Sequence, residues 1–85
     1  MKRFILDFRK VKNIEEAHEE IKSALVFPDY YGKNLDALND CISEMSDDIK
    51  IYILVKKKSF DGIKDIMNVL RDNDIKFEVI TTIGT

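Results

Sequence analysis

The sequence predicts a single α/β domain, a three-stranded parallel sheet packed with about three main helices in the order β-α-α-β-α-β. Two observations support this fold class. Short segments with alternating polarity are separated by segments whose apolar residues recur at helical spacing. Strands separated by helical crossovers pair in parallel, with right-handed connections. With 85 residues, 45% of them hydrophobic, the chain is long enough for one domain, residues 1–85, and one core.

The first half of the chain predicts a strand and a helix. Residues 4–8, FILDF, are a short β-type run. Asn13 predicts the N-cap of a helix over about residues 14–26, because Glu16 follows it as in a capping box. Pro28 is expected to end this helix, since the residue before a proline is pushed out of the helical region. The apolar residues at helical spacing are Ile14, Ala17, Ile21, Ala24 and Leu25.

A loop and a second helix follow. In the loop DYYGK, Gly32 is expected to supply a positive φ. Asn34 is a good N-cap for the second helix, which fades at residues 46–48. Its apolar stripe consists of Leu35, Leu38, Cys41, Ile42 and Met45.

The second half of the chain predicts strand, helix and strand. Residues 49–55 alternate in polarity, Ser59 is placed to cap the third helix, and residues 72–74 close that helix. Its apolar face is Phe60, Ile63, Ile66, Met67 and Leu70. Residues 75–83 form the last strand. Two of the strands alternate with charged residues, whereas a sheet covered on both faces gives continuous apolar runs. We therefore expect two layers, with the helices mainly on one face of the sheet.

The charge distribution bears on the class of partner. The formal net charge is −2, and no basic face is evident, so the sequence gives no support for nucleic-acid binding. Between Asn34 and Asp48 the chain carries only acidic charges, at Asp36, Asp40, Glu44, Asp47 and Asp48. A patch of one sign favours a basic partner and speeds its approach.

The sequence lacks the usual signs of secretion, membrane insertion and cofactor chemistry. Cys41 is the only cysteine, and a secreted domain this small would usually be held by disulfides. The apolar run near the start is too short for a signal peptide or a membrane span. We expect a cytoplasmic protein that is monomeric when free. No glycine-rich phosphate loop, metal-spaced Cys/His cluster or Ser-His-Asp set is present, so no cofactor, metal or catalytic residue is expected.

The unusual stretch is FPDYYGKNLDALNDCI, residues 27–42, in which Asp36 and Asp40 share a helix face. Asp36 suits the positive end of the helix dipole, but Asp40 is mid-helix, without a cation three or four residues away. A solvated polar face is the alternative explanation. Of the two tyrosines, Tyr31 is expected to pack on the core and Tyr30 to remain available to a partner. His18 is expected at the edge of the core, and Cys41 as a small buried hydrophobe.

This stretch resembles the signature LPxYYGxNLDALxDCL of the barstar family, the intracellular inhibitors of barnase-type ribonucleases. The match is dense over residues 27–42, and elsewhere the similarity is mostly in the pattern of strands and helices. The family's fold, a parallel three-stranded sheet packed with helices, agrees with the fold predicted above. The resemblance implies that this chain is an inhibitor and not an enzyme.

The resemblance also implies roles for individual residues. Tyr30 and Gly32 would contact the enzyme, and Asp36 would reach its basic groups. Asp40 would enter the ribonuclease active site, where a substrate phosphate would otherwise bind. The implied contact surface consists of Tyr30, Gly32, Asn34, Asp36, Asn39 and Asp40. The implied partner is a basic ribonuclease of the extracellular type, bound one to one.

The chain departs from the family pattern at several positions. Asn39 and Met45 stand where the family has tryptophans. Lys64 occupies the place of a contact glutamate early in the last helix, with Asp65 beside it. The connection between the second strand and the third helix is also shorter. These differences leave the inhibitor class in place but question barnase itself as the natural target.

Two other functions are compatible with the sequence. A general interaction module of the same fold would bind a basic partner that is not a nuclease. An enzyme that uses Asp36 and Asp40 with a divalent metal is the weaker alternative. Inhibition of RNA cleavage separates the inhibitor from the interaction module, and a metal-binding measurement tests the enzyme.

Overall fold

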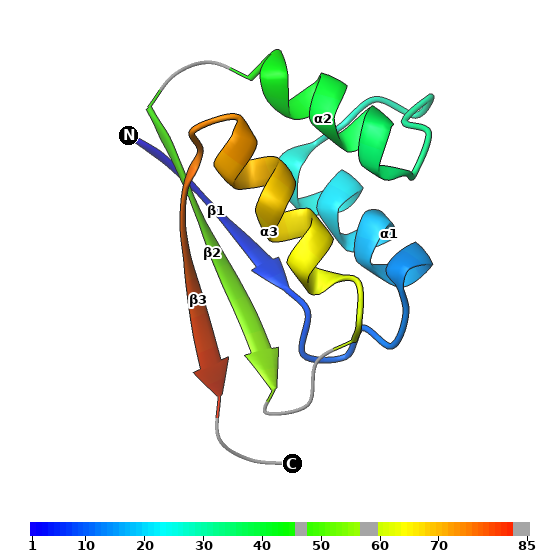
Figure 1. Cartoon of the computed structure of the whole chain (residues 1–85), viewed down its shortest axis with the longest axis vertical. Helices are drawn as coiled ribbons and strands as arrows, with labels where there is room; N and C mark the ends of the chain where they lie inside the picture. The colour runs from blue at the N-terminus through cyan, green and yellow to red at the C-terminus, as the bar shows by residue number, and fades with distance from the viewer. Residues whose placement is uncertain (46–47, 57–59, 83–85) are drawn as a thin grey trace.

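The computed structural model describes residues 1–45, 48–56 and 60–82 and confirms the predicted order of elements. Figure 1 shows three strands on one side and three helices on the other. The strands are β1 (Lys2–Asp7), β2 (Ile49–Lys56) and β3 (Lys76–Thr82). The helices are α1 (Ile14–Leu25), α2 (Leu35–Ser43) and α3 (Ile63–Asp72).

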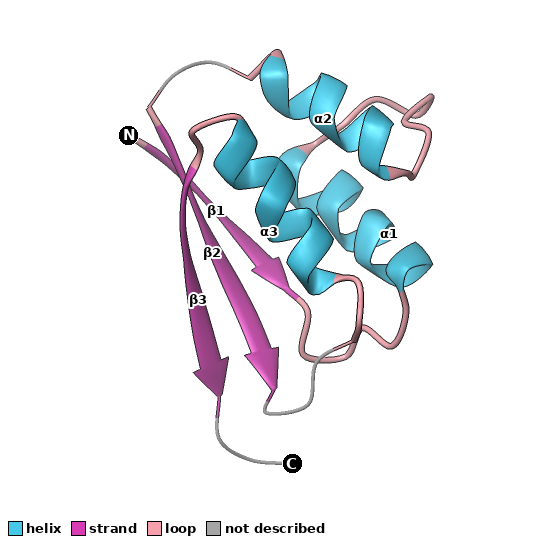
Figure 2. Cartoon of the chain, in the orientation of Figure 1, coloured by secondary structure: helices cyan, strands magenta, loops and turns pink. Residues whose placement is uncertain are grey.

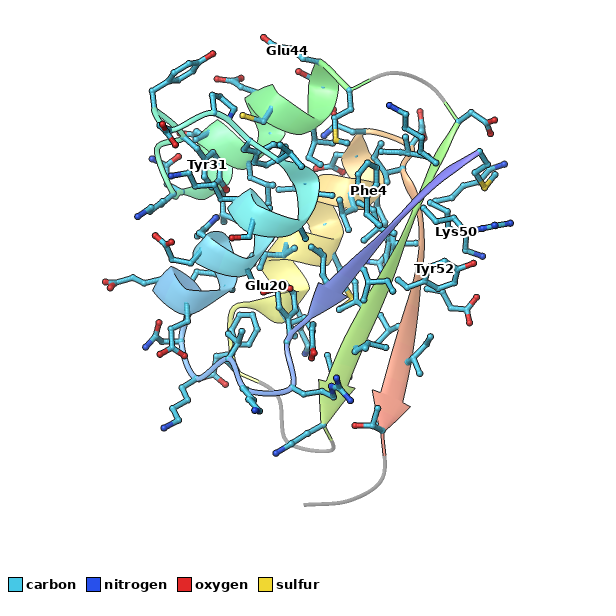
Figure 3. All side chains as sticks on the ribbon, turned by 180° about the vertical axis from the view of Figure 1, so that it is seen from behind. Phe4, Glu20, Tyr31, Glu44, Lys50 and Tyr52 are labelled. Atoms are coloured by element: carbon cyan, nitrogen blue, oxygen red, sulfur yellow. The ribbon has the colours of Figure 1, made fainter. Side chains whose placement is uncertain are left out.

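The sheet is parallel, with β2 in the centre between β1 and β3. Phe4, Ile51 and Phe77 lie side by side across the three strands. Figure 2 shows the helices packed against a single face of the sheet, as the alternating strands predicted. On the opposite face lie Lys50 and Tyr52, which Figure 3 labels on the side of the sheet away from the helices.

The core lies between the sheet and the helices. Ile51 and Ile53 of β2 are completely buried and contribute the centre of the sheet's inner face. Burying one such side chain contributes about 2 kcal/mol relative to leaving it exposed. The helices supply the other half of the core with residues at helical spacing, namely Ala17, Ile21, Leu25, Leu38, Ile42, Ile63, Ile66 and Leu70.

Helix α1 ends slightly before the predicted position. Asn13 caps its start as predicted, accepting a hydrogen bond from the backbone N–H of Glu16 at 2.9 Å. The helix ends at Leu25, because Val26 takes a left-handed conformation with φ 57° and ψ 50°. The backbone N–H of Phe27 then donates to the carbonyl of Lys22. This left-handed cap, and not Pro28 alone, ends the helix.

Helix α3 also begins later than predicted. Its N-cap is Gly62, which makes no side-chain capping hydrogen bond, and Phe60 lies buried before the helix. Gly62 is packed against Ile14, and a Cβ atom added there would come within 2.6 Å of Ile14 Cδ1. The predicted cap at Ser59, like Lys57 and Lys58, lies outside the described residues.

His18 belongs to the core, and its predicted position at the edge of the core is wrong. Only 2% of its surface is exposed. Nδ1 of His18 lies 2.6 Å from the phenolic oxygen of Tyr31, which is also buried. A polar ring is accommodated here because its partner comes from the loop that follows α1, which periodicity within α1 does not reveal.

Candidate partner-binding surface

Helix α2 carries most of the predicted contact residues, and it is held firmly despite its nine residues. A helix this short is not stable alone in water. Leu38 and Ile42 are each 1% exposed and fix the inner side of α2, by about 2 kcal/mol each. At its start, Asn34 Oδ1 accepts a hydrogen bond of 2.8 Å from the backbone N–H of Ala37, which contributes about 1 kcal/mol.

The outer side of α2 is acidic and open to solvent. Asp36, Asn39 and Asp40 are all exposed, and Asp36 and Asp40 lie opposite the buried Leu38 and Ile42. Among the residues that the structure describes, neither Asp36 nor Asp40 forms an ion pair. The two carboxylates are therefore available to cations from another molecule.

The two tyrosines before α2 have opposite environments, as the sequence predicted. Tyr30 is 87% exposed, whereas Tyr31 is 4% exposed. The Tyr31 ring lies 5.1 Å from the Phe27 ring, between centroids, and its hydroxyl meets His18. Figure 3 shows Tyr31 turned inward beneath α2. Burial raises the pKa of Tyr31, so the ring stays neutral. Tyr31 thus anchors the loop, which leaves Tyr30 free to contact a partner.

Ion pairs tie the same loop to α1. Lys33 pairs with Glu19, and this pairing lowers the pKa of the Glu19 carboxyl. Lys22 Nζ lies 3.7 Å from Asp29 Oδ1. Pairs this exposed are screened by solvent and add little to stability. Burial of Tyr31 is therefore the main restraint on the loop, and the ion pairs refine its position.

Gly32 is required for close packing and not for a positive φ, so that prediction is wrong. The positive φ in this part of the loop belongs to Lys33, at 56°. A Cβ atom at Gly32 would lie 3.3 Å from the Cβ of Ala37. The Asn34 side chain spans the same turn, because its Nδ2 donates to the Gly32 carbonyl while its Oδ1 caps α2. Asn34 therefore shapes this surface through the backbone.

Asn39 is linked to α3. Its Oδ1 accepts a hydrogen bond of 2.8 Å from Nδ2 of Asn73, which also donates to the Val69 carbonyl at 2.9 Å. The carboxyl end of α3 therefore lies against α2. Lys64 and Asp65 stand in the first turn of α3, at the other end of the helix from Asn73. At 1.5 Å per residue, that turn lies about 12 Å along the helix axis from Asn73.

A groove beside Asp40 was not predicted from the sequence. It has a volume of about 420 Å³ and lies between the loop after α1 and the outer side of α2. Asp40 and Tyr30 line it together with Leu25, Val26, Phe27, Pro28, Cys41, Glu44 and Met45. The spacing of Asp40 and Glu44, four residues apart, could have indicated that both carboxylates lie on one side of α2, but the groove itself depends on the path of the loop after α1.

Cys41 is only partly buried, so the prediction of a buried hydrophobe holds in part. Desolvation raises the pKa of its thiol, with smaller contributions from the negative charges of Glu44 and Asp40. The thiol therefore remains protonated and is a poor nucleophile. Asp40, Cys41 and Glu44 all line the groove.

Within residues 1–45, 48–56 and 60–82, the acidic, histidine and cysteine side chains form no group of three that could hold a metal ion. In the same part of the chain, no helix has the length and apolarity needed to cross a bilayer.

Together, the parallel α/β fold and the acidic helix beside an exposed tyrosine describe a small domain with a candidate protein-binding surface. Residues 1–79 match the family described as Barstar (barnase inhibitor). The chain therefore belongs to the barstar family. It is also similar to a Bacillus subtilis (strain 168) protein named "Putative ribonuclease inhibitor YrdF". The two are 36% identical over an alignment of 78 residues, and the match covers 85% of this chain and 85% of that protein.

Proposed function

We propose that this chain inhibits a small basic ribonuclease by forming a one-to-one complex that blocks the enzyme's active site. Membership of the barstar family and the similarity to a protein named as a ribonuclease inhibitor support this function. The observation that carries the mechanism is Asp40, an exposed carboxylate on a fixed helix without an ion pair in the described chain.

In this mechanism Asp40 takes the position of a substrate phosphate. A ribonuclease must hold the phosphate of RNA with cationic side chains, and a carboxylate binds such groups through charge-assisted hydrogen bonds. Because α2 is fixed before the encounter, little conformational entropy is lost when the complex forms. The inhibitor performs no chemistry and needs no cofactor, and it works in the cytoplasm as a monomer before binding.

The other residues of the surface have supporting roles. Asp36 attracts basic groups around the active site and speeds association. Tyr30 supplies an aromatic contact, because it is the most exposed aromatic ring next to the acidic helix. Gly32 offers backbone without a side chain, Asn34 holds that backbone and the start of α2 in place, and the exposed Asn39 adds a polar contact next to Asp40.

The test is inhibition of RNA cleavage by a panel that contains barnase and other small basic ribonucleases secreted by bacteria. We expect the chain to inhibit at least one of them stoichiometrically. Asp40→Ala should weaken binding to that enzyme by roughly thirtyfold or more, because its cationic site is left buried and unpaired. Thermal unfolding of the variant should match the parent, since Asp40 makes no side-chain contact that the fold requires.

The matched control is Asp61→Ala, which removes an exposed aspartate from the turn before α3. That turn lies at the end of α3 opposite to the end that contacts α2, so binding should be unchanged. Equal binding by Asp40→Ala and the parent would reject phosphate mimicry. A basic partner that is captured from cells without any loss of RNA cleavage would instead identify an interaction module.

A further inference from the structure

The groove beside Asp40 combines an apolar floor with an acidic rim. Val26, Phe27 and Met45 provide the apolar surface, and Val26 is 82% exposed. Tyr30 stands at the groove with an exposed ring. The volume of about 420 Å³ is large enough for a long side chain of a partner, since pockets for whole small ligands begin at roughly 300 Å³.

The rim of the groove is negative. Asp40 and Glu44 are one helical turn apart, and both line it. Figure 3 shows Glu44 at the end of α2, pointing away from the core. In the described residues Glu44 has no ion pair, and no lysine or arginine is among the residues that line the groove. A partner group that enters here must satisfy a carboxylate and an apolar surface together.

Two of the lining residues are unfavourable for the free chain. Val26 is β-branched and has φ 57°, a conformation that such residues rarely adopt. Glu44 is the C-cap of α2, where the helix dipole disfavours a negative charge. Residues that break local rules in this way are concentrated at functional sites, and here both face the same groove.

We propose that this groove receives an arginine side chain of the ribonuclease, next to the active site that Asp40 blocks. The aliphatic stem of the arginine packs on Val26 and Met45, and its guanidinium pairs with Glu44 and stacks on Tyr30. Arginine fits because its stem is apolar, whereas its planar head binds carboxylates at two points and stacks on aromatic rings. The inference rests on the proposed function and adds a second anchor for the same partner.

The test uses two variants with the ribonuclease that the parent chain inhibits in the panel above. Val26→Gly removes the exposed apolar side chain and relieves the left-handed conformation. Glu44→Gln removes the charge and keeps the shape of the side chain. We expect each variant to raise the dissociation constant about tenfold, because each removes one of the few interface contacts that carry most of the binding energy. Thermal stability should be equal to or higher than that of the parent.

Glu78→Gln is the matched control for charge, since Glu78 lies on the sheet face away from the helices, next to Tyr52. This variant should bind like the parent. To identify the occupant, each arginine at the rim of the ribonuclease active site is changed to alanine. One of these changes should lose its effect when the inhibitor carries Glu44→Gln, as a double-mutant cycle measures.

Each outcome decides the question. Unchanged affinity for both groove variants, together with weak binding by Asp40→Ala, would overturn the groove and leave the proposed function standing. Weaker binding without coupling to any arginine would overturn the arginine assignment. Failure of the parent chain to inhibit every ribonuclease in the panel would reject the proposed function and the groove with it.

Discussion

The phenolic oxygen of Tyr31 lies 2.6 Å from Nδ1 of His18, and both side chains are buried beneath the acidic helix. This hydrogen bond joins the first helix to the loop that carries Tyr30. Burial lowers the pKa of His18 below its ordinary value of 6.5, because a charged imidazolium would lose its hydration. The geometry of the loop that carries Tyr30 is therefore coupled to the neutral state of one histidine.

The first prediction concerns pH. The unfolded chain binds a proton at His18 near pH 6.5, whereas the folded chain binds it only at lower pH. The neutral His18 therefore leaves the folded state at full stability above pH 6.5. As the pH falls below 6.5, the unfolded chain gains a proton that the folded chain does not, and the folded state loses stability. Chemical denaturation between pH 7.5 and 5 should show a decreasing free energy of unfolding.

His18→Gln is the control for this pH effect, and it should flatten the profile in the same range. The carboxyls with lowered pKa do not interfere. Asp7, whose pKa is lowered to about 2 by its hydrogen bonds with Arg9, loses its contribution below pH 3.8, its ordinary value. Glu19, whose pKa is lowered by its pairing with Lys33, likewise loses its contribution only below pH 4.5, its ordinary value. A parent profile that is flat from pH 7.5 to 5 would contradict the role of His18.

The second prediction concerns Gly32. Gly32→Ala should lower the free energy of unfolding by about 1 kcal/mol, because the added methyl group meets the Cβ of Ala37, which cannot rotate away. On an Ala37→Gly background the same change should become stabilising by about 0.5 kcal/mol, since alanine restricts the unfolded chain. Urea titrations of the four proteins measure both values. Equal effects on the two backgrounds would mean that the steric contact is unimportant.

The third prediction concerns the contact between Asn39 and Asn73. Asn39→Ala should cost less than 1 kcal/mol, and Asn73→Ala should cost more, because Asn73 also donates to the Val69 carbonyl. A double-mutant cycle should give a coupling of about 0.5 kcal/mol. Asn73→Ala should also weaken ribonuclease binding slightly, as it releases a contact residue. Additive effects on stability would show that the hydrogen bond does not form in solution.

The fourth prediction separates the two aspartates kinetically. Asp36→Asn should reduce the association rate constant and the dependence of that rate on salt, with little effect on dissociation. Asp40→Ala should mainly accelerate dissociation, because it removes a buried pair from the complex. Stopped-flow association between about 0.05 and 0.5 M salt spans the range over which surface charges become screened. Identical kinetic effects of the two variants would contradict this division of roles.

The sequence predicted the order and faces of the elements because those follow from local patterns. The alternation in residues 49–55 places Ile51 and Ile53 inside, and both are fully buried. Asn13 and Asn34 cap their helices as predicted, because N-capping depends only on residues two or three positions away. The stretch at residues 27–42 likewise indicated the candidate surface.

Features that depend on distant residues could not be predicted in this way. His18 looks like an edge residue until Tyr31 supplies a partner for its ring. Asn39 gains its partner from α3, 34 positions along the chain. The left-handed conformation of Val26 follows from how the loop must turn, and so does the groove that Val26 helps to line.

The left-handed Val26 has a consequence for attempts to engineer this protein. Replacing it with glycine or asparagine, or neutralising the carboxylate at the end of α2, is the kind of change that a screen for heat resistance selects. Under the proposed groove contact, such a screen would select variants of higher thermal stability that bind the ribonuclease less tightly. Improved versions of this inhibitor must therefore be selected on the complex, with the ribonuclease present at every round.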